Sequence, residues 1–171
     1  GRMPAIVDPD GPGGEPISIF ESGAILIYLA DKTGKLLPKE GAARYAVLQW
    51  LMFQMGGVGP MFGQLGFFHA YKGREIEDKR PLTRYVNETK RLLNVLNQRL
   101  EGRDWIMGGE YTIADMAIWP WYGRLALHGA YDDAGTFLSV DEYEHVQRWT
   151  KQLADRPGVK RGAMVNKTSG P

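Results

Sequence analysis

The sequence predicts an α+β protein in which a short β-hairpin and one helix precede an all-helical part. Two short apolar runs, at residues 4–8 and 17–20, flank a stretch dense in proline and glycine, which is typical of a hairpin. From Glu21 onward the apolar spacing becomes helical, and it stays helical after a short linker. We therefore expect two domains, residues 1–38 and residues 39–171.

Composition places the chain among ordinary folded proteins. It has 171 residues, of which 43% are hydrophobic and 24% are charged, and its net charge is +1. Such a balance creates no large field, so we expect neither nucleic acid nor a membrane surface as a partner. No apolar run approaches the roughly 20 residues that span a bilayer, and the first residues lack the pattern of a signal peptide. The expected location is the cytoplasm.

Cysteine is absent from the 171 residues, which excludes a disulfide, a thiolate metal ligand and a cysteine nucleophile within them. Any thiol chemistry must therefore use a thiol from elsewhere. The three histidines, His69, His128 and His145, are too widely spaced to form a local zinc motif. We expect no metal.

Helical periodicity predicts where the helices begin and end. The first helix follows Glu21 and stops at Gly34, a residue that tolerates positive φ. A helix at residues 42–55 runs into the glycines before Pro60, which should kink or loosen it. Residues 80–100 carry an apolar stripe opposite a charged face, as expected of a helix at the surface of a core.

The C-terminal third contains a helix start with a reciprocal pair of capping residues. The Thr112 side chain can accept from a free amide while Asp115 reaches back to the start of the helix. Pro120 should bend this helix unless it ends earlier. The last predicted helix covers residues 141–155 and should stop at Arg156-Pro157-Gly158. The polar residues 159–171 should drape over the surface.

Two short motifs could hold a small molecule. Glu21 and Ser22 stand at a strand-to-helix junction, where free amides and the helix dipole favour a carboxylate while Glu21 could hold an adjacent ammonium. The alternative is an ordinary Ser cap with an exposed Glu. A cis bond at Met3-Pro4 would expose the backbone of Met3 to an extended ligand, and the alternative is an ordinary trans proline.

Residues 1–8 and 20–30 together resemble the later half of the thioredoxin-like domain of glutathione transferases. Residues 112–121, with the capping pair and Trp119-Pro120-Trp121, are similar to the centre of the helical domain of that family. The resemblance covers almost the whole chain, and it is particularly close to the bacterial nu class of glutathione-dependent disulfide-bond oxidoreductases. It implies the C-terminal half of a thioredoxin-like domain followed by an all-α domain.

The resemblance also implies a binding site for glutathione and a role for each residue. Met3 would bond through its backbone to the cysteinyl part of the ligand, with Pro4 cis, and Glu21 and Ser22 would hold the γ-glutamyl end. Two glutathione molecules are expected in each subunit of a homodimer. Arg84 would contact the ligand pair, its alternative being a surface pair with Glu88.

Gln54 matches a further possible contact with the ligand, its alternative being an amide that faces solvent. Six aromatic residues could line an apolar pocket for a second substrate, or could simply be core: Phe67, Phe68, Tyr71, Trp119, Trp121 and Tyr122.

Three functions remain open. The first is glutathione-dependent reduction of a small disulfide, and the second is conjugation of glutathione to an electrophile. The third is a non-catalytic module that docks partners. Members of the resembled family carry a strand, a helix and a second strand before the segment that corresponds to Gly1, and their activating residue lies there. We therefore expect a longer parent protein and name no catalytic residue.

Overall fold

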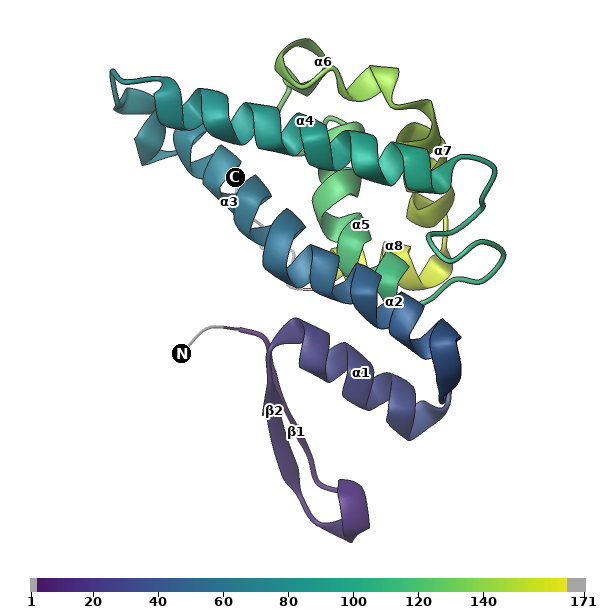
Figure 1. Cartoon of the computed structure of the whole chain (residues 1–171). Coiled ribbons are helices and arrows are strands. Elements are labelled where there is room, and N and C mark those ends of the chain that lie inside the picture. Colours follow the sequence, from purple (N-terminus) through teal and green to yellow (C-terminus); the bar gives the residue numbers. More distant parts are fainter. Residues whose placement is uncertain (1–2, 166–171) are drawn as a thin grey trace.

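The computed structural model describes residues 3–165 (Figure 1). A two-stranded antiparallel sheet and one helix lie on one side of a larger group of helices. In chain order the elements are β1 (Ala5–Asp8), η1 (Pro12–Gly14), β2 (Ile17–Phe20), α1 (Ser22–Thr33), α2 (Gly41–Phe53), η2 (Gln54–Val58), α3 (Gly59–His69), η3 (Lys72–Glu75), α4 (Arg80–Leu100), α5 (Ile113–Ala126), α6 (Ala134–Phe137), η4 (Val140–Glu142), α7 (Glu144–Ala154) and α8 (Pro157–Met164).

The hairpin forms where the sequence predicts it. Ala5 pairs with Phe20 and Asp8 pairs with Ile17, so the two strands run antiparallel in a simple register. Successive side chains alternate between two faces of a strand. One face is partly buried, whereas the other is open, with Val7 and Phe20 each 71% exposed.

A charged cluster ties the hairpin to α1. The Asp8 carboxylate accepts hydrogen bonds from the Tyr28 hydroxyl and from Lys32 Nζ, each at 2.6 Å. The bond from Lys32 is the main reason why the pKa of Asp8 is lowered to about 2. Because both donors lie on α1, the cluster sets how the hairpin sits against that helix.

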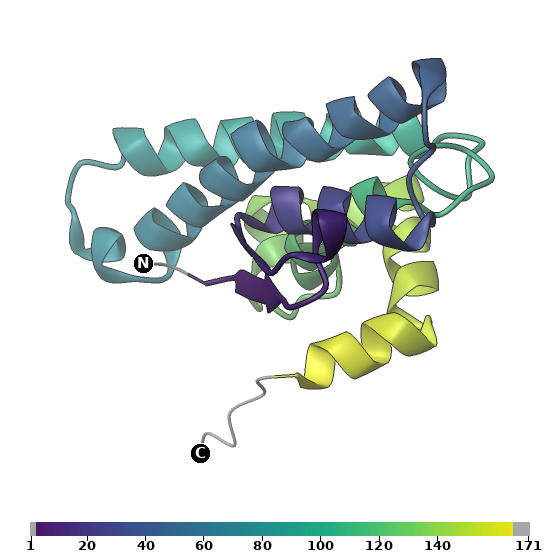
Figure 2. The ribbon, with the colours of Figure 1, turned by 90° about the horizontal axis from the view of Figure 1, so that it is seen from below.

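Helix α1 ends at the predicted residue. Gly34 adopts a left-handed conformation with φ of 65°, and its amide donates to the carbonyl of Ala30. The inward side chains of α1, including Ile25 and Ala30, are buried, and the helix packs against α5. Seen from below, the hairpin and α1 lie in front of the helical group, with α2 to α4 toward the top of the view and α8 toward the bottom (Figure 2).

The predicted loosening after α2 takes the form of a π-helical turn. Instead of breaking, the chain continues through η2 into α3, and the Gly59 amide donates to the carbonyl of Gln54, five residues earlier. Pro60 stands just after the π turn, and its missing amide removes one donor from a helix that is continuous from α2 into α3. The π turn contains one residue more than an α-helical turn. The side chains of α3 are therefore rotated relative to the direction they would have if α2 continued as a regular α-helix.

Helix α4 spans the predicted residues 80–100. Four leucines of its apolar stripe are at most 1% exposed, and the helix packs against α3 and α7. Tyr85, on the same stripe, is only partly buried. The fully buried residues of the stripe are Leu92, Leu93, Leu96 and Leu100. Amphipathic patterning thus predicts both the length and the inward face of α4.

The reciprocal capping pair is present at the start of α5. Thr112 Oγ1 accepts from the amide of Ala114, and Asp115 Oδ2 accepts from the amide of Thr112 at 3.1 Å. Asp115 Oδ1 also accepts from the amide of Ile106 at 3.0 Å and from Trp149 Nε1 at 2.9 Å. Helix α5 runs through Pro120 to Ala126, so this proline does not end it.

Two predictions for the C-terminal part need correction. The last predicted helix begins later, at Glu144, because residues 140–142 form a 3-10 turn before it. Pro157 does end α7, but it also starts α8, since proline suits the first turn of a helix. Residues 159–164 are therefore helical, whereas the predicted draped tail beyond residue 165 lies outside the described residues.

Within residues 3–165, none of the helices has the length and apolar character needed to cross a membrane.

Replacing Asp115 with alanine should lower the free energy of unfolding by about 3 kcal/mol or more. The substitution leaves the buried donors of Ile106, Thr112 and Trp149 without an acceptor, and each such group costs about 1–3 kcal/mol. Urea denaturation followed by tryptophan fluorescence measures the effect, with Asp104→Ala at an exposed position as control. A loss below about 1 kcal/mol would contradict the structural role of this carboxylate.

Candidate functional site

The junction between β2 and α1 contains a strained residue. Glu21 has φ of 70° and ψ of 120°, a combination that residues other than glycine rarely adopt. Such a conformation costs about 1–3 kcal/mol, and residues of this kind cluster at functional sites. The turn at Glu21 allows α1 to begin immediately at Ser22, with the Ile25 amide donating to the Glu21 carbonyl.

The start of α1 has the properties of an anion site. The amides of Ser22, Gly23 and Ala24 donate to no other described residue, and no acidic side chain occupies the first turn. Free amides and the positive end of the helix dipole favour a negative group at this position. The predicted Ser cap is not formed, because the N-cap residue is Glu21 and no side chain caps the helix.

Met3 and Pro4 lie beside the same junction. The bond between them is cis, as the family resemblance implied. Since Ala5 pairs with Phe20, the antiparallel register carries Pro4 and Met3 towards the start of α1. Figure 1 shows the N-terminal segment passing that end of the helix. The structure therefore brings Met3, Pro4, Glu21 and Ser22 into one neighbourhood.

Met55 is a residue of this neighbourhood that sequence reasoning did not identify. The Ser22 hydroxyl donates to Met55 Sδ at 3.8 Å. The Met55 side chain also packs on Gly23 so closely that a Cβ at that position would lie 3.0 Å from Met55 Cε. No local sequence pattern reveals this contact, because the two residues are 33 positions apart.

Gln54 is a buried residue of η2, but its amide is not among the fully buried side-chain groups that lack a partner in the described part of the chain. The residue as a whole is 6% exposed, and its side chain makes no hydrogen bond to another described residue. It packs beside Gly59, where a Cβ would lie 2.8 Å from Gln54 Nε2. Because the amide keeps some accessible surface and has no bond to the protein, it is open to water or to a ligand.

Arg84 lies on the exposed face of α4 and does not form the surface pair that was its alternative. Glu88 instead accepts from Arg91, with Nη2 at 2.7 Å and Nε at 2.9 Å, and this bond is the main cause of the lowered pKa of Glu88. Arg84 has no carboxylate within 4.0 Å among the described residues.

Arg84 borders a hollow of about 600 Å³ between α3 and α4. Its other lining residues are Met61, Asn87, Glu88 and Arg91. The lining of this hollow includes none of Met3, Glu21 or Ser22.

The six aromatic candidates do not converge on one pocket. Tyr122 is core, with its hydroxyl donating to the carbonyl of Leu92 and its pKa raised by burial. Trp119 donates to the carbonyl of Thr150 and borders a hollow of about 910 Å³ between α5 and α8. Phe67, Phe68 and Tyr71 lie at or just beyond the C-terminal end of α3. Most of this set contributes to packing.

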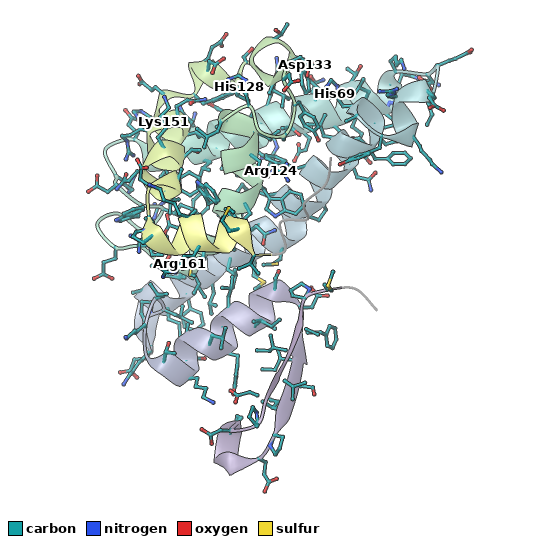
Figure 3. All side chains as sticks on the ribbon, turned by 180° about the vertical axis from the view of Figure 1, so that it is seen from behind. His69, Arg124, His128, Asp133, Lys151 and Arg161 are labelled. Atoms are coloured by element: carbon teal, nitrogen blue, oxygen red, sulfur yellow. The ribbon has the colours of Figure 1, made fainter. Side chains whose placement is uncertain are left out.

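The histidines are paired with single carboxylates. His69 Nε2 lies 3.1 Å from Asp133 and His128 Nε2 lies 3.0 Å from Asp141, and Figure 3 shows His69 and Asp133 side by side. The His69 ring also stacks on Phe137 at 4.0 Å between centroids. Within the part of the chain that the structure describes, no three His, Cys, Asp or Glu side chains are grouped in a way that could hold a metal.

Comparison with known proteins places the chain in a family. Residues 82–152 match the model of the glutathione S-transferase C-terminal domain. The chain is 48% identical over 156 residues to the disulfide-bond oxidoreductase YghU of Escherichia coli, covering 91% of this chain and 53% of YghU. It is 45% identical over 161 residues to YfcG of the same organism, covering 92% and 69%. The chain therefore spans about half the length of YghU.

Solved structures agree with this placement. A glutathione transferase from Burkholderia graminis, with two glutathione molecules bound per subunit, is 56% identical and superimposes with a TM-score of 0.91 over 99% of this chain and 69% of that one. One from Pseudomonas putida, with one glutathione disulfide per subunit, is 54% identical with a TM-score of 0.90 over 96% and 70%. The chain belongs to the glutathione transferase family, with a small thioredoxin-like part and a helical C-terminal domain.

Substitutions of Glu21 should separate backbone strain from side-chain chemistry. Glu21→Gly is expected to raise the free energy of unfolding by about 1 kcal/mol, because glycine adopts positive φ without the steric cost. Glu21→Gln keeps the strain and should change stability by less than about 0.5 kcal/mol. Urea denaturation of both variants measures the difference. If the glycine variant is the less stable by more than about 1 kcal/mol, the strain interpretation is wrong.

Proposed function

We propose that this protein binds glutathione at the start of α1. The observation that carries the proposal is the junction itself, where three free amides, the Ser22 hydroxyl and the strained Glu21 meet in a chain whose relatives hold glutathione. The γ-glutamyl carboxylate would accept from Ser22 and the amides, and Glu21 would bind the adjacent ammonium. The backbone of Met3 would pair with the cysteinyl part.

The reaction that fits best is glutathione-dependent reduction of a disulfide. A glutathione thiolate attacks one sulfur of the substrate disulfide and releases a thiolate, and a second glutathione then attacks the mixed disulfide. Two glutathiones are thereby oxidised to glutathione disulfide while the substrate becomes two thiols. The relatives support this reaction, because YghU and YfcG are disulfide-bond oxidoreductases and two glutathiones or their disulfide occupy the solved structures.

Arg84 and Gln54 are proposed as further contacts. Arg84 has no carboxylate within 4.0 Å among the described residues, whereas Arg91 in the same hollow is already bonded to Glu88, so Arg84 is the group there that suits a carboxylate of the ligand pair. Gln54 offers an amide with no hydrogen-bond partner among those residues.

The resemblance to the nu class supports a proposal about the oligomeric state and the cellular location of the protein. We propose that it is a nu-class member acting as a cytoplasmic homodimer, with residues 1–38 contributing to the glutathione-binding domain and residues 39–171 forming the helical domain. No residue among those described is assigned as the activating group for the thiol.

Conjugation of glutathione to an electrophile is the second candidate. A Phanerochaete chrysosporium protein called Ure2p5, 29% identical with a TM-score of 0.79, was cocrystallised with 1-(S-glutathionyl)-2,4-dinitrobenzene. That relative holds a conjugate rather than a disulfide. Measuring turnover of both substrate types separates the candidates.

The binding proposal predicts that Ser22→Ala weakens glutathione binding roughly tenfold or more, because a hydrogen bond to a charged group contributes about 1.5–3 kcal/mol. Isothermal titration with glutathione measures this, and Ser18→Ala on the exposed face of β2 is the matched control. The reaction is tested by glutathione-dependent reduction of 2-hydroxyethyl disulfide against conjugation of 1-chloro-2,4-dinitrobenzene. Absence of glutathione binding by the wild type would contradict the proposal, and turnover of the halide alone would favour conjugation.

Replacing Gln54 with methionine should weaken glutathione binding about fivefold without destabilising the protein. The change removes the amide proposed to contact the ligand, which has no hydrogen bond to a described residue, while keeping an unbranched side chain of similar length. Titration calorimetry and urea denaturation give the two quantities, and Gln49→Met at an exposed position of α2 is the control. Unchanged affinity together with a loss of stability above about 1 kcal/mol would show that Gln54 is purely structural.

A further inference from the structure

The contact between η2 and the start of α1 points to a role for Met55. Its thioether lies 3.8 Å from the Ser22 hydroxyl, and its side chain covers Gly23, the next residue of α1. We propose that Met55 is a positioning residue that orients the Ser22 hydroxyl for the amino-acid end of glutathione. This inference rests on the glutathione-binding function proposed above.

The chemistry of a thioether suits this role. A serine hydroxyl without a partner can point in three staggered directions, only some of which face a ligand. Sulfur is a weak acceptor, so Met55 can favour one direction in the free protein and still yield the hydroxyl to a carboxylate, which binds it more strongly. Orientation before binding reduces the ordering that the ligand must impose.

The π-helical turn explains how Met55 reaches this position. Gln54 and Met55 are adjacent, yet Gln54 is buried and Met55 is partly buried against α1. The turn inserts an extra residue into the helix, and π-bulges of this kind are frequently found at functional sites. At the two following residues, Gly56 and Gly57, an added Cβ would have no neighbour within 4 Å.

Packing alone is the competing explanation. The missing side chain of Gly23 leaves space that any flexible apolar residue could fill, and leucine fills it about as well as methionine. Leucine has no acceptor for the Ser22 hydroxyl. Met55→Leu therefore separates orientation from packing.

The experiment is a double-mutant cycle on glutathione affinity in the intact protein. We expect Met55→Leu to raise the glutathione Kd about threefold, which corresponds to free choice among three rotamers, with the urea midpoint unchanged. In the Ser22→Ala background the same substitution should leave Kd unchanged, because there is no hydroxyl to orient. Met52→Leu, an exposed methionine of α2, is the matched control.

Each other outcome is decisive. An unchanged Kd in Met55→Leu would overturn the inference and leave Met55 as packing. A threefold loss that persists in the Ser22→Ala background would also overturn it, because Met55 would then act independently of Ser22. If the wild type itself does not bind glutathione, the proposed function is wrong. This outcome differs from failure of the Met55 inference because no variant in the cycle would then bind glutathione either.

Discussion

The buried Asp115 carboxylate is the interaction on which the arrangement of the helices depends. It accepts from the amides of Ile106 and Thr112 and from Trp149, so it joins the loop before α5, the start of α5 and the middle of α7. Burial raises the pKa of Asp115, and these hydrogen bonds oppose that effect by stabilising the charged form. The free-energy cost of burying a charge is therefore met by donors from three separate parts of the chain.

The position of the candidate site follows from this arrangement. Helix α5 packs against α1, α2, η2 and α7, so whatever fixes α5 also fixes the two elements that meet at Ser22 and Met55. The strained backbone of Glu21 requires support of this kind, because an unsupported turn would relax. Contacts of Asp8 with Tyr28 and Lys32 provide the second support by holding the hairpin on α1.

Features governed by neighbouring residues could be predicted from the sequence. The hairpin pairing, the end of α1 at Gly34 and the capping pair Thr112 and Asp115 each depend on a few consecutive residues, and the structure contains all three. Amphipathic spacing was sufficient to predict the length and the inward face of α4, because its apolar stripe is long. The residues around Pro157 predicted the end of α7. They did not predict that the same proline starts α8.

Features that depend on distant residues could not be predicted. The contact of Met55 with Ser22 joins segments 33 residues apart, and the burial of Gln54 depends on how η2 packs. Glycines between two helices predict a weak point, but they do not say whether the chain breaks or widens into a π turn. The pairing of Glu88 with Arg91 rather than Arg84 depends on rotamers, since both spacings are favourable on a helix.

The geometry of the site separates binding from activation. The dipole of α1 favours a negative group near its first turn, and its influence falls off within that turn. In the proposed pose this group is the γ-glutamyl carboxylate, at the opposite end of the glutamyl residue from the bond to cysteine. The amides and Ser22 therefore stabilise the bound ligand without acting directly on its sulfur. A thiolate that is stabilised in this protein must take its hydrogen bonds from other groups, so changes at Ser22 or Met55 belong to affinity rather than to the pKa of the thiol.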